Sequence, residues 1–200
     1  MKRYKWLLIG IGTAAVAVSI VLIISTRRTR EEKVIEEKQE EFAGTDYYTR
    51  VYIDRGDYYY NRGDYDKAIE SYKQAIAHDS NSASAHSSLA FMYYVKGELD
   101  KAMDGFKKAI EIYPKFVGAY YYLGRIYDKK GMFDEAIEQY KMAIKLSPQY
   151  ISAYYYLGKD YEAIGRISDA IRTYQRCLNY VIRKDDAKEL RDRIRQLKRR

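Results

Sequence analysis

A repeat of 34 residues is the feature of this sequence that most restricts its fold. An alanine recurs at that interval, followed four places later by a ring and seven places later by a small residue. The alanines are Ala68, Ala102, Ala136 and Ala170, the rings are Tyr72, Phe106, Tyr140 and Tyr174, and the small residues are Ala75, Ala109, Ala143 and Cys177. Because the interval holds at independent positions, four copies of one supersecondary unit follow one another along the chain.

Each unit has the pattern of two amphipathic helices joined by a tight turn. From Ala119 to Pro148, apolar or aromatic residues lie three, four and seven places apart in two runs that break at Gly131. A glycine there suits the left-handed backbone just past a helix end. Acidic or hydroxyl residues shortly after it suit the N-cap of the second helix. The turn glycines are Gly63, Gly97, Gly131 and Gly165, and the expected caps are Asp66, Asp100, Asp134 and Ser168 or Asp169.

The order of residue types closely resembles the tetratricopeptide-repeat (TPR) family pattern, W/Y-x2-L-G-x2-Y, then A-x3-F/Y-x2-A, then P. In the third unit these positions are Tyr120, Leu123, Gly124, Tyr127, Ala136, Tyr140, Ala143 and Pro148. The resemblance covers units at about 49–82, 83–116, 117–150 and 151–184. It implies an all-α fold, a right-handed α-solenoid of four helical hairpins within residues 46–184. The outer units depart most, at Arg55, Ser80, Cys177 and Ile182, as expected for edge repeats.

Segments of different character flank the repeats. Residues 185–200 place Ala187, Leu190, Ile194 and Leu197 on one helical stripe, which predicts a basic capping helix that closes the stack. Residues 27–45 contain six Glu and few apolar residues, which is typical of a charged stalk or linker. Residues 1–5 form a basic N-terminal tail.

Residues 6–26 contain no charge over twenty-one positions, and about 20 apolar residues are enough for a helix to cross a bilayer. We therefore expect a single transmembrane anchor. A cleaved secretory signal is the alternative, because Lys2, Arg3 and Lys5 resemble its n-region. Arginines at 27, 28 and 30 nearly balance the N-terminal charges. We favour an inner membrane with the repeat domain on the periplasmic or extracytoplasmic side, and a cytosol-facing domain remains the alternative.

The formal net charge of +8 does not predict a nucleic-acid-binding domain. The positive charge is concentrated in residues 1–30 and 183–200, and residues 46–182 are nearly neutral. Cys177 is the only cysteine and has no intramolecular partner for a disulfide, so it does not indicate a redox compartment.

Tyrosine provides 24 of the 30 aromatic residues, and the TPR resemblance implies where many of them lie. In that family the first helices of successive hairpins line a concave groove that accepts a peptide or a partner's helix. The positions carried over as partner-binding are Tyr60, Phe91, Tyr94, Tyr121, Tyr122, Arg125, Tyr155, Tyr156 and Lys159, with Asp54, Asp57, Asn61 and Ser88 beside them. Tyrosines are frequent in binding hot spots. In the competing interpretation, the consecutive tyrosines merely wrap around a helix, and one of each triplet is core.

Some TPR domains hold a C-terminal carboxylate with a cluster of Lys and Asn. At the matching positions this chain has Ile53, Asp57, Ser88, Gly118 and Tyr122, so that clamp is absent. Arg125 and Lys159 occupy equivalent places in adjacent units and could pair with an acidic group.

Residues for chemistry are few. His78 and His86 are the only histidines, and His86 occupies a position that carries tyrosine in later units, which favours packing. No phosphate-binding loop, zinc spacing or nucleophile motif occurs. We expect no catalytic residue, cofactor or metal. The leading hypothesis is a membrane-anchored scaffold or adaptor that recruits other proteins, and the alternative is a structural subunit that drives homo-oligomerisation or assembly of a larger enzyme complex.

Overall fold

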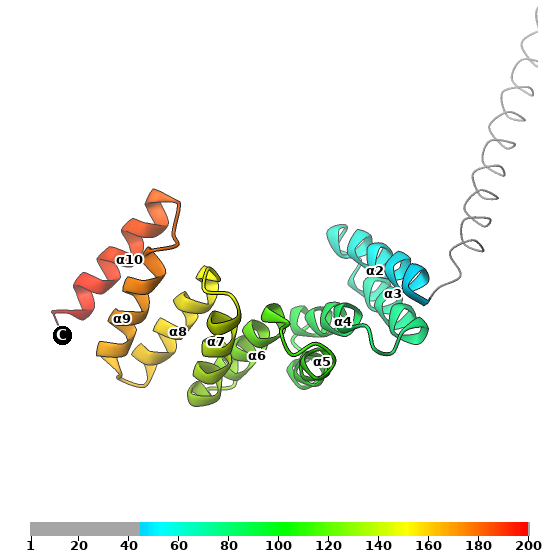
Figure 1. The fold of residues 1–200 in the computed structure, drawn as a ribbon, viewed down its shortest axis with the longest axis horizontal. Helices are drawn as coiled ribbons and strands as arrows, with labels where there is room; N and C mark the ends of the chain where they lie inside the picture. Colours follow the sequence, from blue (N-terminus) through cyan, green and yellow to red (C-terminus); the bar gives the residue numbers. More distant parts are fainter. Residues whose placement is uncertain (1–44, 200) are drawn as a thin grey trace, which may run out of the picture. The chain divides into compact units, whose positions relative to one another are not determined.

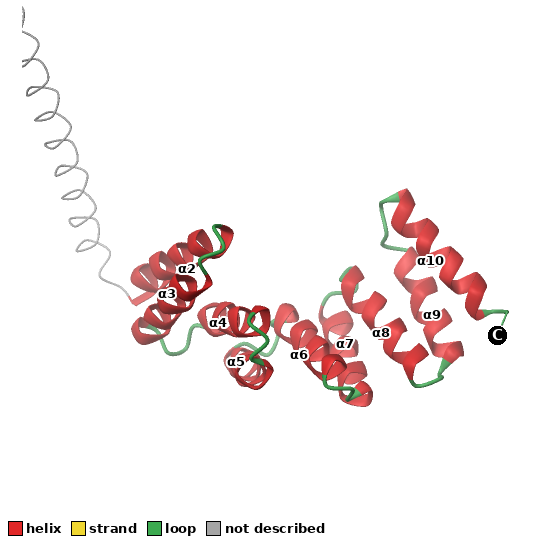
Figure 2. Ribbon diagram, turned by 180° about the vertical axis from the view of Figure 1, so that it is seen from behind, coloured by secondary structure: helices red, strands yellow, loops and turns green. Residues whose placement is uncertain are grey.

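In the computed structural model, residues 45–199 are described, and helices and short loops make up that entire range (Figure 2). The described helices are α2 (Thr45–Asn61), α3 (Tyr65–His78), α4 (Ala83–Val95), α5 (Leu99–Ile112), α6 (Val117–Lys129), α7 (Phe133–Leu146), α8 (Ile151–Ala163), α9 (Ile167–Leu178) and α10 (Lys184–Leu197). The all-α prediction is confirmed for this range. The predicted tail, anchor and most of the stalk lie outside it, and no helix inside it has the length and apolar run that a bilayer span requires.

The four turn glycines end the first helix of each hairpin as expected. Each has a positive φ, between 73° and 79°, which a residue with a side chain rarely adopts. In the third unit the Gly131 N–H donates to the Asp128 carbonyl at 2.9 Å, and the Met132 N–H donates to the Tyr127 carbonyl at 2.9 Å. The other three turns repeat this pair of bonds, which is the Schellman motif.

The predicted N-caps of the second helices were wrong. The residues at the cap positions are Asp64, Glu98, Met132 and Arg166, and only the Asp64 side chain accepts a capping bond, from the Lys67 N–H. The acidic residues expected there lie in the first turn of each helix instead. Carboxylates in the first turn still stabilise the helix, because they face the positive end of its dipole.

Contacts between the described helices follow chain order. Each helix from α3 to α9 packs on the next one, and the first helices of successive hairpins, α4 with α6 and α6 with α8, also touch (Figure 1). No hairpin therefore has a core of its own that is independent of its neighbours, as expected of a repeat array.

Within three hairpins, a tyrosine of the second helix packs directly on a glycine of the first. A Cβ atom added to Gly124 would lie 2.5 Å from Tyr140 Cε1, and one added to Gly158 would lie 2.3 Å from Tyr174 Cε1. Gly56 and Tyr72 repeat the arrangement at 2.3 Å. Glycine at this place is thus required by the close approach of a buried ring.

In the second hairpin the two helices also approach closely, but the glycine that permits it lies on the second helix instead of the first. Ala90 replaces the glycine of the first helix, and Gly105 lies opposite it on the second. A Cβ atom added to Gly105 would lie only 2.8 Å from Ala90 Cβ. One of the two helices must present a glycine for the pair to approach this closely.

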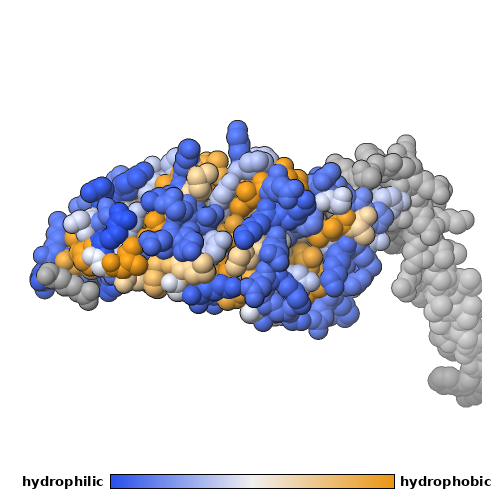
Figure 3. All heavy atoms as spheres, turned by 90° about the horizontal axis from the view of Figure 1, so that it is seen from below, coloured by the Kyte–Doolittle hydropathy of each residue, from blue (hydrophilic) through white to orange (hydrophobic). Residues whose placement is uncertain are grey.

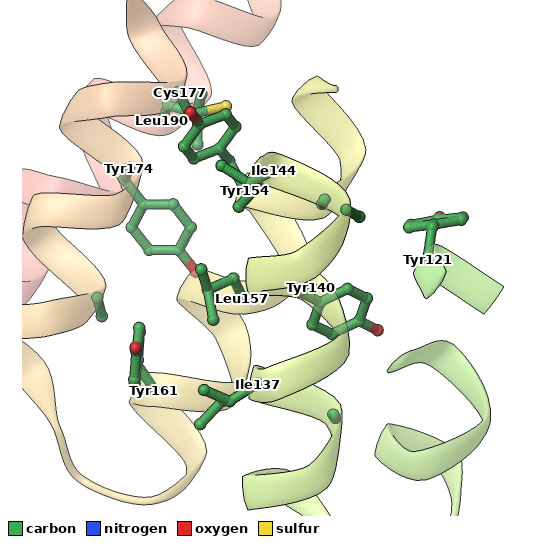
Figure 4. Close-up of a cluster of buried hydrophobic side chains, with 14 of the residues drawn as sticks. Tyr121, Ile137, Tyr140, Ile144, Tyr154, Leu157, Tyr161, Tyr174, Cys177 and Leu190 are labelled. Carbon is green, nitrogen blue, oxygen red and sulfur yellow. The ribbon is translucent and has the colours of Figure 1, made fainter. Parts of the chain in front are cut away.

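Rings and small residues fill the core between hairpins. Figure 4 shows Tyr140, Tyr154 and Tyr174 among Ile137, Ile144 and Leu157, and Tyr140 and Tyr174 are at most 1 % exposed. At the C-terminal end α10 buries the four residues of its apolar stripe, Ala187, Leu190, Ile194 and Leu197. This helix covers a face of α9 that would otherwise be open to water.

A candidate partner-binding face

Aromatic side chains from the first helices of all four hairpins form one chain of ring contacts, here called the aromatic ladder. Its members are Tyr60 of α2, Phe91 of α4, Tyr121 and Tyr122 of α6, and Tyr155 and Tyr156 of α8. The ring centroids are 5.5 Å apart for Tyr60–Phe91, 5.1 Å for Phe91–Tyr122, 5.0 Å for Tyr122–Tyr121, 6.0 Å for Tyr121–Tyr156 and 5.4 Å for Tyr156–Tyr155. These are favourable separations for edge-to-face and offset pairs.

The structure brings the sequence-predicted groove residues together, but it exposes them unequally. The rings of Tyr60, Phe91, Tyr94, Tyr122, Tyr155 and Tyr156 are half-buried, so each packs on its neighbours and keeps part of its surface in water. Arg125 is also half-buried, and Lys159 is exposed. Tyr121 differs from the expectation, because it is only 8 % exposed and belongs to the core.

The burial of Tyr121 comes from the following unit. Tyr150, which precedes α8, places its ring 5.3 Å from that of Tyr121. The residue 34 places after Tyr150 is Lys184, so Tyr155, the equivalent of Tyr121, has no such ring over it. Tyr121 is therefore the buried member of the ladder, whereas Tyr155 is half-buried.

Cations lie over the rings at the C-terminal half of the ladder. The Arg125 guanidinium lies 3.8 Å from the centre of the Tyr156 ring and donates to the Tyr121 hydroxyl at 3.2 Å. Lys159 Nζ is 5.7 Å from the same Tyr156 ring, and Lys129 Nζ is 5.4 Å from the Tyr94 ring. Such cation–π contacts hold the guanidinium in place and leave a positive surface beside the ladder.

A pocket of about 450 Å³ opens at the N-terminal end of the ladder, and we call it the Asp57 pocket. Its lining comes from three hairpins and consists of Asp57, Tyr60, Asn61, Tyr72, Ser87, Ser88, Phe91, Phe116, Gly118 and Tyr122. Six of these residues were assigned to the groove from the sequence. The Tyr72 hydroxyl donates to Asp57 Oδ1 at 2.6 Å, and together with burial this bond raises the pKa of Tyr72.

A second pocket, of about 700 Å³, lies between α8, α9 and α10 and was not predicted. Tyr155, Lys159, Tyr174 and Arg193 are among its lining residues. Arg193 of α10 donates twice to Glu162 of α8, at 2.9 and 2.6 Å, and the Tyr174 hydroxyl donates to the same carboxylate at 2.7 Å. The capping helix thus continues the candidate face beyond the fourth hairpin.

Beneath the ladder, a buried carboxyl group lies between the third and fourth hairpins. Asp160 is 1 % exposed, and its Oδ2 atom has no hydrogen-bond partner. Burial, followed by the nearby Asp128 carboxylate, raises the pKa of Asp160 to about 7. The Tyr140 hydroxyl is also buried without a partner, and its pKa is raised by burial and by both carboxylates. This cluster was not predicted from the sequence, because Asp160 takes the place of Ile126 and Met92 in the preceding units.

The remaining candidates for chemistry have structural roles. His86 Nε2 lies 3.0 Å from the Ser80 carbonyl oxygen, and its equivalent Tyr120 donates to the Pro114 carbonyl at 3.2 Å. Burial raises the pKa of the Cys177 thiol to about 11. Within residues 45–199, no group of three or more His, Cys, Asp or Glu side chains is arranged to hold a metal ion.

The surface chemistry is mixed. On the face drawn in Figure 3, apolar side chains form separate patches between hydrophilic ones.

Family models match most of the repeat region. One described as TPR repeat matches residues 56–97 and 124–165, and two described as Tetratricopeptide repeat match 106–138 and, separately, 88–115 and 152–181. Together they cover residues 56–181 without a gap. A search of curated protein sequences finds no significant match.

Solved structures share the fold. The crystal structure of MamA is 29% identical with a TM-score of 0.63, covering 72% of this chain and 83% of that one. Pseudomonas aeruginosa pilF is 21% identical with a TM-score of 0.67, covering 77% and 75%. The first TPR of Spaghetti (RPAP3), bound to the HSP90 peptide SRMEEVD, is 22% identical with a TM-score of 0.57, covering 58% and 93%. With the 34-residue period, the turn glycines and the glycine–ring packing, these matches show that the chain belongs to the tetratricopeptide-repeat family.

Proposed function

We propose that this protein is a membrane-anchored scaffold that recruits or organises partner proteins on the aromatic ladder and its two flanking pockets. It acts by binding and not by catalysis. TPR domains are interaction modules, and the structure of the first TPR of Spaghetti holds a peptide. The apolar segment 6–26 supports the membrane anchor, and the charged residues 27–45 would space the repeats from the bilayer.

The half-exposed state of the ladder is the observation that carries this proposal. Five of its six rings present part of their surface, and all six contact neighbouring rings or cations that hold them in position. Rings that are already ordered lose little conformational entropy when a partner covers them. Binding hot spots have this character, with aromatic anchors in well-packed surroundings.

A paired substitution tests the proposal. Tyr122→Ala with Tyr156→Ala removes two rings from the ladder, and we expect it to abolish co-purification of partner proteins from native membranes. The matched control is Tyr58→Ala with Tyr113→Ala, because those rings are 56% and 50% exposed and lie outside the ladder. Circular dichroism must show equal helix content in both proteins. Equal recovery of partner proteins with the ladder variant and with the control would refute the proposal that partners bind on the aromatic ladder.

The topology and self-association of the protein are separate proposals. We place the repeat domain on the periplasmic or extracytoplasmic side of an inner membrane, and protease accessibility in spheroplasts decides between this and a cytosol-facing domain. Assembly of several copies stays a prediction. Light scattering of the purified protein over a range of concentrations would reveal it.

A further inference from the structure

The Asp57 pocket is the part of the candidate face with the clearest chemical preference. Asp57 is the only charged residue among the ten that line it, and the rest are rings, small residues and one amide. Within the described range 45–199, Asp57 forms no ion pair, and its side chain is exposed to solvent. The pocket therefore presents a single negative charge at the end of an aromatic surface.

The carboxylate is held in position from below. The buried Tyr72 ring packs on Gly56 and donates its hydroxyl to Asp57 Oδ1 at 2.6 Å. Among the residues that the structure describes, none donates a hydrogen bond to the second carboxylate oxygen, which remains available to a ligand. Asp54, one turn earlier on the same exposed face of α2, adds further negative potential near the mouth.

The walls suit an organic cation. Phe91 lies between the rings of Tyr60 and Tyr122, at centroid distances of 5.5 and 5.1 Å, so the three rings line one side of the pocket together. Aromatic faces attract ammonium and guanidinium groups and also cover the methylene stem of a lysine or arginine. A metal ion would need several oxygen ligands, and this lining offers one carboxylate.

The size of the pocket limits what enters it. A cavity of about 450 Å³ is near the lower end of the range of roughly 300–1,000 Å³ for ligand sites. It accommodates one or two side chains, whereas a whole helix would have to lie across the ladder outside it. Gly118 and the two serines, Ser87 and Ser88, keep the entrance open because they carry no large side chain.

We propose that the Asp57 pocket receives a lysine or arginine side chain from a segment of a partner protein, with its charge at Asp57 and its stem against Phe91 and Tyr122. This inference rests on the proposed scaffold function and specifies its partner as a basic segment. An acidic peptide, such as the SRMEEVD bound to the first TPR of Spaghetti, would meet an unfavourable charge here.

An array of amidated twelve-residue peptides of varied net charge tests the proposal. The full chain, purified in a neutral detergent, is incubated with the array, and bound protein is scored against peptide charge. We expect peptides with lysine or arginine to be enriched, and their binding to fall as salt rises. Asp57→Asn keeps the shape and the oxygen that accepts from Tyr72, and should weaken binding of the enriched peptides about tenfold. Asp104→Asn is the matched control, because Asp104 is an exposed residue of α5 that does not line the pocket, and it should change affinity less than twofold.

Three outcomes would overturn the inference. They are enrichment of acidic peptides, the same preference for basic peptides in Asp57→Asn as in the wild type, and no binding to any peptide. The scaffold proposal is judged separately by partner recovery with the Tyr122 and Tyr156 variants. If those variants lose their partners while the array shows no basic preference, the ladder is a binding face and the charge assignment is wrong.

Discussion

The glycine at the crossing of paired helices allows the packing model to be tested in one substitution. In Gly124→Ala the new Cβ would lie 2.5, 2.7 and 2.9 Å from three atoms of the Tyr140 ring, where carbon atoms normally stay about 3.5–4.0 Å apart. The ring is fully buried and has no open space to enter. The helices must therefore separate by about 1 Å, and overpacking of this kind costs about 1–3 kcal/mol.

Helix propensity opposes this effect. Alanine is better than glycine in a helix interior by about 1 kcal/mol, so the net loss of stability should be about 0–2 kcal/mol. Gly118→Ala is the control on the same helix α6, because its new Cβ would approach no atom closer than Phe116 Cε1 at 3.5 Å. We expect that variant to be neutral or slightly stabilised. Urea unfolding of the full chain, followed by circular dichroism, gives both values.

The second hairpin suggests a second substitution that would compensate for the lost stability. Gln139 corresponds to Gly105, which faces Ala90 in the hairpin where the first helix carries the alanine. Adding Gln139→Gly to Gly124→Ala should restore part of the lost stability. If Gly124→Ala is as stable as Gly118→Ala, the close approach of helix and ring does not limit packing, and this reasoning fails.

Three further predictions concern single groups. The pKa of Asp160 in the native state is about 7, above its ordinary value, so the native state holds a proton that the unfolded state releases. The free energy of unfolding therefore falls as the pH rises from about 4 through 7, by an amount on the order of 2–4 kcal/mol. Asp160→Asn should remove this fall, as measured by urea unfolding at pH 5 and pH 8, and equal pH dependence in both proteins would contradict the assignment. Arg193→Ala leaves the nearly buried Glu162 carboxylate with only one partner, the Tyr174 hydroxyl. The backbone amides of α9 and α10 should then lose about 1–3 kcal/mol of protection against hydrogen exchange. Unchanged exchange would show that the ion pair does not hold the capping helix in place. The Cys177 thiol, with its pKa raised to about 11 and no exposed surface, should react with Ellman's reagent at pH 8 only as the protein unfolds, and rapid labelling of the native protein would refute this.

Most of the fold could be predicted from the sequence because the same pattern of small and aromatic core residues occurs in all four units. A glycine that recurs every 34 residues after an apolar run marks the turn, and the positive φ of Gly131 and its equivalents confirms this. The N-caps could not be placed in the same way. Periodicity identifies the buried face of a helix but not its first residue, and the cap positions hold unrelated residues such as Met132 and Arg166.

The candidate face was predictable in position but not in detail. The repeat register identified the ring-bearing positions, yet Tyr121 is buried and Tyr155 only half-buried, because the residue that follows is Tyr150 in one case and Lys184 in the other. That difference is visible in the sequence once the residue 34 places onward is compared. The buried Asp160 gave no such signal, because the equivalent residues of the preceding units are Ile126 and Met92. Glu162 and Arg193 each lie 34 places after a residue of the same charge, Asp128 and Lys159, but their pairing across α8 and α10 is visible only in the structure.

Site-specific photo-crosslinking in native membranes tests the central claim most directly. A photoreactive phenylalanine analogue replaces either Tyr94 or Tyr113. Tyr94 is half-buried and its ring contacts Tyr122 of the ladder, whereas Tyr113 is exposed and makes no contact with the ladder rings. We expect partner proteins to crosslink from position 94 and not from position 113. Crosslinks from position 113 alone, or none from position 94 while partners still co-purify, would show that partners bind elsewhere on the repeats.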